Sequence, residues 1–316
     1  MKNELLPFFQ RRRFAAVLLL LAVLFWAGNV VVARACGQDL PPLWMTFGRW
    51  SMASLLLCPL AGRALRHQRR ELWACRWRLL WLGALGIACN NAFIYLGVMH
   101  SGATSAAALQ TLTPVWIVLL SALRRRLPVE TWLGVGLAVF GALLIAVHGD
   151  LLNAPSAILG SGGIWLLAAS VCWALYTLSV VKLPRQLDAG ALLAVQAVAG
   201  ALLLLPVAWV AEPEGLHAAL SGADWLALGY LGLFPSVLAY AFYRRGADKL
   251  GATLAGNCMN LMPPMSALLS MVFLGERLQW FHVVGFVSIM SGLAVGSGAW
   301  LRLPFFSFGL LRADSR

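Results

Sequence analysis

The chain alternates long apolar runs with short polar segments. Ten of these runs approach the roughly 20 residues that an α-helix needs to cross a bilayer. The connections are short and leave no room for a sizeable soluble domain. The pattern therefore predicts an all-α integral membrane protein with ten transmembrane helices, and we place them at residues 14–33, 43–61, 78–98, 102–122, 131–148, 162–181, 189–211, 223–243, 251–274 and 280–300.

The composition supports a lipid environment and argues against a nucleic-acid partner. Hydrophobic residues make up 61% of the chain and charged residues only 11%, whereas soluble domains carry about 25% charged residues. The formal net charge of +12 could indicate nucleic-acid binding. The basic residues, however, form short clusters between apolar runs. An anionic inner leaflet explains that distribution better than a phosphate backbone, so we expect a bilayer partner and no nucleic acid.

The positions of lysine and arginine predict the orientation of the chain. If residues 1–13 are cytoplasmic, all but three of the 24 basic residues fall in cytoplasmic segments, as the positive-inside rule requires. The exceptions are Arg34, Arg277 and Arg49, and only Arg49 lies within a predicted span. The alternation holds across every loop, which favours an even number of spans. Both termini, including the tail 301–316, are then cytoplasmic.

The two halves of the chain resemble each other weakly, which predicts an internal repeat. Residues 1–149 would form the first five-helix repeat and residues 150–316 the second. An odd number of spans per repeat means that the second repeat is inverted in the membrane, an architecture of transporters with the solute site between the halves. The matching pairs include Trp26-Ala27 with Trp173-Ala174, Gly102-Ala103-Thr104 with Gly251-Ala252-Thr253, Pro114 with Pro263, and Gly136 with Gly285.

Several short motifs resemble the EamA family of the drug/metabolite transporter superfamily. They are Trp26-Ala27-Gly28-Asn29, the Gly-Ala-Thr with a downstream proline in each half, and Leu274-Gly275-Glu276-Arg277. The resemblance covers about residues 14–300 and implies a two-repeat exporter of amino acids or other metabolites in a bacterial inner (plasma) membrane. The sequence departs from the family after the fourth span, where residues 124–127 read Arg-Arg-Arg-Leu instead of carrying a Gly-Glu pair.

Polar residues and prolines inside two equivalent spans predict the position of the solute site. Polar side chains in a span are costly, so they face protein or water, and a proline-broken helix frees carbonyls that need partners. The fourth span carries Gln110 and Thr113 before Pro114. The ninth carries, at spacings that place them on one face, Thr253, Asn257, Asn260, Pro263 and Pro264.

Further candidates for solute contact lie in other spans. They are Asn90 and Asn91 in the third span, Tyr240 in the eighth, Trp26 and Asn29 in the first, and the equivalent Trp173 and Tyr176 in the sixth. Aromatic rings among them would suit a flat or apolar part of a solute. The alternative is structural, because amides and hydroxyls also hold membrane helices together, prolines often only kink a helix, and buried tryptophan often only packs.

The remaining charged residues, glycines, cysteines and histidines are interpreted as structural. Arg49 lies about six residues from the outer end of its span, so we expect its side chain to extend along the helix to the interface, with a role as the partner of an anion as the alternative. Glu276 is expected to be structural, with Arg277 as its candidate partner. The stripe of Gly285, Gly292 and Gly296 predicts close packing against Gly134 and Gly141 of the fifth span, with a homodimer contact as the alternative. The scattered cysteines and histidines indicate neither a metal site nor a cofactor.

No acidic residue lies at the middle of a span, and this restricts the mechanism. A carrier that loads a proton or an organic cation onto a buried carboxylate would need one. We therefore expect a secondary transporter for a small neutral or zwitterionic solute, working by alternating access. A membrane-embedded enzyme acting on a lipid would need acids, histidines or a serine–base pair at membrane depth, and a channel would not need two interconvertible halves. These two classes are the alternatives.

Overall fold

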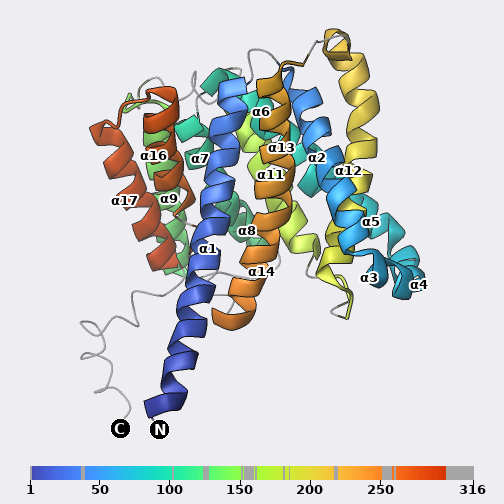
Figure 1. The fold of residues 1–316 in the computed structure, drawn as a ribbon. Coiled ribbons are helices and arrows are strands. Elements are labelled where there is room, and N and C mark those ends of the chain that lie inside the picture. Colours follow the sequence, from blue (N-terminus) through green and yellow to red (C-terminus); the bar gives the residue numbers. More distant parts are fainter. Residues whose placement is uncertain are drawn as a thin grey trace.

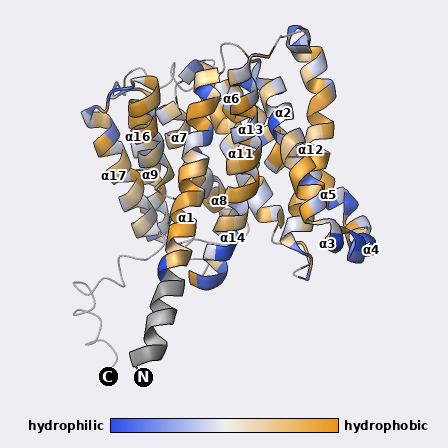
Figure 2. Ribbon diagram, viewed as in Figure 1, coloured by the Kyte–Doolittle hydropathy of each residue, from blue (hydrophilic) through white to orange (hydrophobic). Residues whose placement is uncertain are grey.

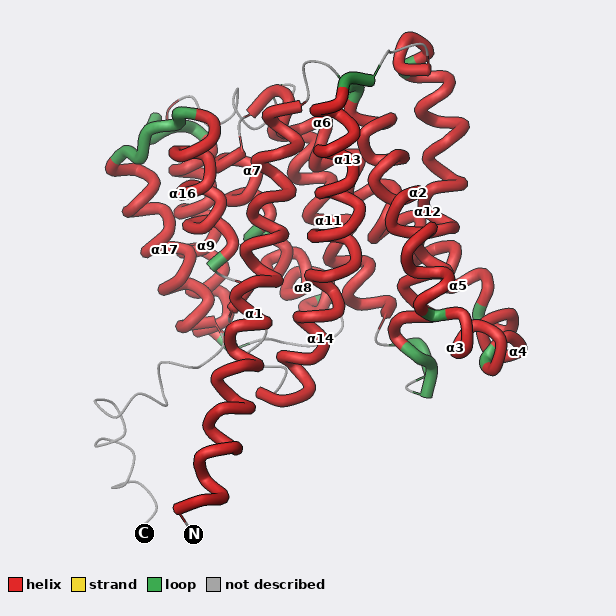
Figure 3. Tube along the Cα trace, in the orientation of Figure 1, coloured by secondary structure: helices red, strands yellow, loops and turns green. Residues whose placement is uncertain are grey.

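A computed structural model describes the chain at residues 2–36, 40–101, 103–123, 128–150, 152, 160, 162–180, 182–184, 186–216, 220–250, 258, 259 and 261–296. Over these residues the chain consists of helices and loops without a strand (Figure 3). The helices stand side by side in one bundle (Figure 1). The expectation of an all-helical chain is confirmed for this described part.

Most helices follow the predicted spans closely. In chain order they are α1 (Lys2–Cys36), α2 (Pro42–Leu60), α3 (Gly62–His67), α4 (Arg69–Ala74), α5 (Arg76–Leu82), η1 (Gly83–Cys89), α6 (Asn90–Ser101), α7 (Ala103–Gln110), α8 (Thr113–Ala122), α9 (Val129–Ala146), α11 (Gly163–Val180), α12 (Ala189–Ala211), η3 (Pro213–Leu216), α13 (Gly222–Leu233), η4 (Phe234–Leu238), α14 (Ala239–Leu250), α16 (Met262–Leu274) and α17 (Trp280–Gly296).

Seven helical stretches in the described part are long and apolar enough to cross a membrane. They are 13–36, 76–101, 103–120, 129–146, 163–180, 189–211 and 222–250. Two of them run through a π-helical turn, η1 in the second stretch and η4 in the last. The 19-residue α2 and the shorter apolar helices α16 and α17 occupy the other three predicted spans.

The surface of the bundle is apolar around its middle and basic at one end. Large side chains such as Leu55, Leu202 and Val272 are exposed, and apolar residues run along the outer helices (Figure 2). A soluble protein does not expose apolar surface on this scale. Polar residues gather at α3, α4 and the end of α14, on the side where α1 begins and α17 ends (Figures 1 and 2). The chain is therefore a multi-pass membrane protein.

The helices contact one another in reciprocal pairs. Helix α1 packs against α14, and α6 packs against α11. The π-turn η4 contacts α1 and α2, while η1 contacts α11 and α12. Three further contacts join helices that would be equivalent in a repeat, namely α2 with α12, α7 with α16, and α9 with α17. Each half thus packs against the other through matching surfaces.

The contact between α9 and α17 is built on glycine. A Cβ atom added at Gly134 would meet the backbone of Gly292 and Gly296, and one added at Gly141 would meet the Gly285 carbonyl oxygen. The two backbones approach this closely because none of these residues has a side chain. The prediction that the glycine stripe of the tenth span packs against the fifth span is confirmed.

Glu276 joins the loop after α16 to the beginning of α7. Gly275 ends α16 in the left-handed conformation, with a φ of 69°, which glycine adopts without strain. The Glu276 carboxylate then accepts hydrogen bonds from the Thr104 hydroxyl at 2.6 Å and the Ala103 N–H at 3.4 Å. Glu276 therefore has a structural role, as expected, but its partners are in α7.

A second acid holds the beginning of another helix at the same end. Glu212, directly after α12, accepts hydrogen bonds from the N–H groups of Leu43 at 3.0 Å and Trp44 at 3.4 Å. Negative charge at a helix N-terminus is favourable. Partial burial nevertheless raises the pKa of Glu212 above its usual value. Each of these two carboxylates thus joins a residue of the second half to the beginning of a helix in the first half.

The glycine contact gives a matched pair of substitutions in α9. Gly141→Ala would push a methyl group into the Gly285 carbonyl, whereas Gly136→Ala places it in open space. We expect Gly141→Ala to destabilise the protein by about 1–3 kcal/mol through overpacking. Gly136→Ala should be neutral or stabilising by up to about 1 kcal/mol, because alanine favours the helix. Thermal unfolding in detergent measures both, and equal effects would contradict the packing described.

Candidate functional site

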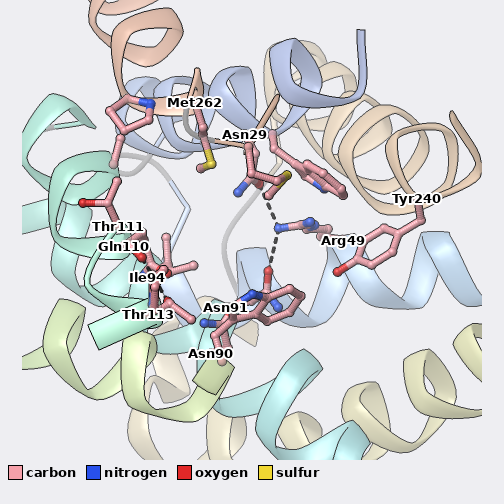
Figure 4. A pocket seen from close by; sticks show the side chains of 16 residues that line it. Asn29, Arg49, Asn90, Asn91, Ile94, Gln110, Thr111, Thr113, Tyr240 and Met262 are labelled. Carbon is pink, nitrogen blue, oxygen red and sulfur yellow. Dashed lines mark hydrogen bonds between the residues drawn. The ribbon is translucent and has the colours of Figure 1, made fainter. Parts of the chain in front are cut away.

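A cavity of about 260 Å³ lies inside the bundle, between helices from both halves of the chain. Its wall is partly amide and hydroxyl and partly aromatic or thioether, and the side chains converge on one space (Figure 4). The volume lies just below the roughly 300–1,000 Å³ of pockets for drug-sized ligands. The residues that line it are Trp26, Asn29, Arg49, Asn90, Asn91, Ile94, Ala107, Gln110, Thr111, Thr113, Pro114, Trp173, Tyr240, Met259, Met262 and Pro263.

The fourth span is interrupted where it meets the cavity. Helix α7 ends at Gln110 and α8 begins at Thr113, which places Pro114 in the first turn of α8. A proline there removes no helical hydrogen bond, because the first N–H groups of a helix have no partner. The hydroxyls of Thr111 and Thr113 donate to the carbonyls of Ala108 at 2.6 Å and Gln110 at 2.9 Å. Carbonyl groups at the interruption are therefore hydrogen-bonded by side chains of the same span.

The ninth span has an equivalent beginning beside the cavity. Helix α16 starts at Met262, so Pro263 and Pro264 lie in its first turn. Pro263 lines the cavity together with Met259 and Met262, and Pro264 is not among the lining residues. Three predicted residues of this span, namely Thr253, Asn257 and Asn260, lie outside the described residues.

Arg49 lies inside the bundle, and the expectation that it extends to the interface is wrong. Only 2% of the side chain is exposed. Its Nε donates to the Ser236 hydroxyl at 2.6 Å. Its Nη1 donates to Asn29 Oδ1 at 2.8 Å, Asn91 Oδ1 at 2.9 Å and the Tyr95 hydroxyl at 3.0 Å.

The position of Arg49 on the buried face of α2 explains why its side chain points into the bundle. This face includes Thr46, Arg49, Ala53 and Leu57, at helical spacings of three and four residues. The exposed side of the helix carries large apolar residues such as Leu55. Arg49 therefore shares the face that meets the other helices, and neutral oxygens are within reach there.

Two π-helical turns help to position two of the groups that hold Arg49, namely Asn91 and Ser236. The Asn91 amide donates to the carbonyls of Gly86 and Ile87 in η1, both at 3.0 Å, which directs its oxygen toward Arg49. In η4, the Ser236 hydroxyl donates to the Leu231 carbonyl at 2.7 Å while it accepts from Arg49. Single π-turns in helices are found frequently at functional sites.

Aromatic rings form another part of the wall. Trp26 and Tyr240 meet edge to face with ring centroids 5.4 Å apart, and Trp26 Nε1 donates to the Pro235 carbonyl at 3.0 Å. Trp173 lines the cavity with Tyr176 stacked on it at 4.9 Å. Tyr176 is not among the lining residues, because its hydroxyl donates to Gln196 Oε1 at 3.1 Å.

The structure brings most of the sequence candidates together. Those that line the cavity are Trp26, Asn29, Asn90, Asn91, Gln110, Thr113, Pro114, Trp173, Tyr240 and Pro263. Other residues that line the cavity were not predicted as solute contacts, namely Arg49, Ile94, Ala107, Thr111, Met259 and Met262. The signal for Arg49 was its helical spacing from Thr46 and Ala53, which predicts an inward face. The apolar residues and Thr111 carry no comparable signal.

The oxygens of Asn29 and Asn91 already have protein partners, because both accept from Arg49. The Asn90 amide nitrogen donates to the Ala169 carbonyl at 2.9 Å. Gln110 differs from these three, since its Nε2 is buried without a hydrogen-bond partner in the part of the chain that the structure describes. Among the residues that the structure describes, no group of three or more His, Cys, Asp or Glu side chains could hold a metal ion.

The fold and the site together define a class, which is a helical, multi-pass membrane protein with a small cavity of mixed polar and apolar lining between its two halves. Two copies of the EamA-like transporter family model match the chain, at residues 13–147 and 160–297. The chain therefore belongs to the EamA-like transporter family of the drug/metabolite transporter superfamily, whose members are not enzymes.

Curated relatives cover most of the chain. The uncharacterized transporter YyaM of Bacillus subtilis is 25% identical over 72% of this chain and 74% of its own length. The uncharacterized inner membrane transporter YedA of Escherichia coli K12 is 28% identical over 84% of this chain and 86% of its own. The uncharacterized inner membrane transporter YicL of Salmonella typhimurium is 30% identical, over 68% and 71%.

A solved structure has the same fold. A crystal structure of a protein that is 22% identical superposes with a TM-score of 0.64 over 92% of this chain and 98% of that one. At this identity the likeness shows the fold alone.

The hydrogen bond between Ser236 and Arg49 can be tested with two serine substitutions. Ser236→Ala removes a partner of a buried guanidinium, and bonds to charged groups contribute about 1.5–3 kcal/mol. Ser54→Ala on α2 removes only a bond to the Trp50 carbonyl in the same helix, so we expect a change within about 0.5 kcal/mol. Chemical unfolding in lipid bicelles measures both. A loss for Ser236→Ala no larger than that for Ser54→Ala would contradict the network.

Proposed function

We propose that this chain is a secondary transporter that moves a small neutral or zwitterionic metabolite, such as an amino acid, across the inner membrane by alternating access. The observation that carries the proposal is a cavity lined by polar and apolar side chains from both halves, in a chain that belongs to a transporter family. A cavity of about 260 Å³ suits a small metabolite better than a lipid.

The proposed topology has ten spans in two inverted repeats, at residues 1–149 and 150–316, with both termini in the cytoplasm. The two family matches each cover one half. The reciprocal contacts, α1 with α14 and α6 with α11, relate the halves as an inverted repeat would. The start of α1 and the end of α17 on the same side of the bundle support an even number of spans (Figure 1).

Alternating access follows from that symmetry. If the two repeats can exchange conformations, the cavity opens to one side and then to the other with states of similar energy. Matching interfaces, such as η4 on α1 and α2 and η1 on α11 and α12, are the surfaces that would move. The break between α7 and α8 and the proline-containing first turn of α16 would be the bending points beside the solute.

Different lining residues would have different roles in solute binding. Gln110 contributes an amide nitrogen without a protein partner, and Thr111 and Thr113 keep the interrupted backbone in place. The rings of Trp26, Trp173 and Tyr240 would receive an apolar part of the solute. Asn257 and Asn260 would add amides from the ninth span. Export is the expected direction.

Transport tests the site assignment directly. Metabolite profiles of cells that lack or overproduce the protein, compared inside and outside, identify the solute, and counterflow in proteoliposomes measures its exchange. We expect saturable counterflow, and a reduction of roughly five- to tenfold for Gln110→Ala and Asn260→Ala, because each removes a polar contact worth about 1–1.5 kcal/mol.

The matched control is Ser54→Ala, whose hydroxyl bonds only within α2 and does not line the cavity. It should exchange solute at the wild-type rate. Wild-type exchange by both Gln110→Ala and Asn260→Ala would remove the proposed site. Flux that does not saturate and shows no counterflow would indicate a channel.

A further inference from the structure

Arg49 has hydrogen-bond donors that the protein does not use. A guanidinium carries five N–H donors, one on Nε and two on each Nη. Nε donates to Ser236, and Nη1 faces the oxygens of Asn29, Asn91 and Tyr95. Within the described ranges, the structure gives Nη2 no acceptor. Since Arg49 also lines the cavity, these donors are available to its contents.

The partners of Arg49 leave its charge without a counter-ion. All four are neutral, being two amides, a phenol and a hydroxyl. None of the chain's 12 acidic residues lies at the middle of a predicted span. Buried acids that the structure describes have other duties, as when Asp224 caps α13 with Ser221. A positive charge buried at membrane depth without an anion is costly, and such residues usually serve function.

The equivalent position in the second half shows that the structural contact does not need a charge. The offset of 147 residues that relates Trp26 to Trp173 also relates Asn29 to Tyr176 and Arg49 to Gln196. Asn29 accepts a hydrogen bond from Arg49, and Tyr176 donates one to Gln196. Both equivalent residues are buried, with 2% of each side chain exposed. One half therefore builds this contact with a neutral amide, and the other uses a guanidinium.

Resting on the transport function proposed above, we propose that the solute carries a carboxylate group and that this group binds Arg49 through Nη2. A guanidinium presents parallel N–H groups that match the two oxygens of a carboxylate. The network of neutral oxygens fixes the plane of the guanidinium before the solute arrives. Gln110, whose Nε2 has no partner, lies on the other side of the cavity from Arg49 as drawn in Figure 4.

This assignment narrows the neutral or zwitterionic class to solutes with an acidic end. In a zwitterion the carboxylate meets Arg49, while the apolar part packs against Trp26, Tyr240 and Met262. Organic cations without a carboxylate are excluded, because the fixed positive charge repels them in a site of low dielectric constant. The positive charge of Arg49 lies in the first half only, because the equivalent residue of the second half is the neutral Gln196. The charge can therefore select the solute although the second half has no equivalent of it.

Profiling with charge variants tests the proposal, and the probe is the cell's own pool of metabolites. Cells produce the wild type, Arg49→Gln, Arg49→Lys or Arg34→Gln, and the distribution of each metabolite between cell and medium is compared with cells that lack the protein. Arg34→Gln is the matched control, because Arg34 donates to the carbonyls of Val98 and Met99 and does not line the cavity. Counterflow of the identified solute and of its carboxamide, which lacks the carboxylate charge, follows in proteoliposomes, with the melting temperature of each variant.

We expect every redistributed solute to carry a carboxylate. Arg49→Gln should reduce its counterflow at least tenfold, Arg49→Lys should keep part of it, and Arg34→Gln should leave it unchanged. The wild type should transport the acid at least tenfold better than its amide. Solutes without an acidic group, or carboxylate transport by folded Arg49→Gln at the wild-type rate, would overturn this inference and leave the transport function standing.

Two other outcomes are also decisive. If Arg49→Gln does not fold, the wild-type comparison of acid and amide settles the question, since equal transport of the two overturns the inference and preference for the acid supports it. If no metabolite is redistributed by the wild type, the proposed transport function fails, and the carboxylate site fails with it.

Discussion

A guanidinium enclosed in a membrane bundle must be surrounded by oxygen atoms, and this requirement organises the centre of the protein. Arg49 projects from α2 and takes its partners from α1, α6 and η4. Asn91 in turn holds the carbonyls that η1 leaves free. One side chain thus links three helices of the first half to one helix of the second. The cavity lies directly beside this link, so its polar wall and its position have the same physical origin.

The features that follow from lipid and from backbone geometry could be predicted from the sequence. Apolar runs predict helices because a bilayer offers no other partner for backbone N–H and carbonyl groups. The glycine stripe of α17 predicts close approach, since only glycine allows the backbones of Gly134 and Gly292 to meet. Polar residues and prolines in equivalent spans indicated which helices surround the cavity. Each of these patterns depends on local sequence alone.

The features that depend on how helices turn toward one another could not be predicted in the same way. Arg49 is near enough to the membrane surface to extend there, and its spacing from Thr46 and Ala53 indicates an inward face without showing which partners it meets there. Asn29 and Asn91 are polar residues of the expected kind, but their oxygens serve Arg49. The π-turns that direct Asn91 and Ser236 leave no pattern in residues 83–89 or 234–238. Tyr176 matches Asn29 in sequence, yet it bonds Gln196 outside the cavity wall.

The proposed function requires that a single cavity opens alternately to the two sides of the membrane. A cysteine at Thr111, in a variant without the six native cysteines, places a reactive thiol on the cavity wall. Labelling with a membrane-impermeant maleimide from each side of oriented vesicles is the direct measurement. The account predicts labelling from both sides and protection from both by the transported solute. Labelling from one side only, unaffected by solute, would contradict it.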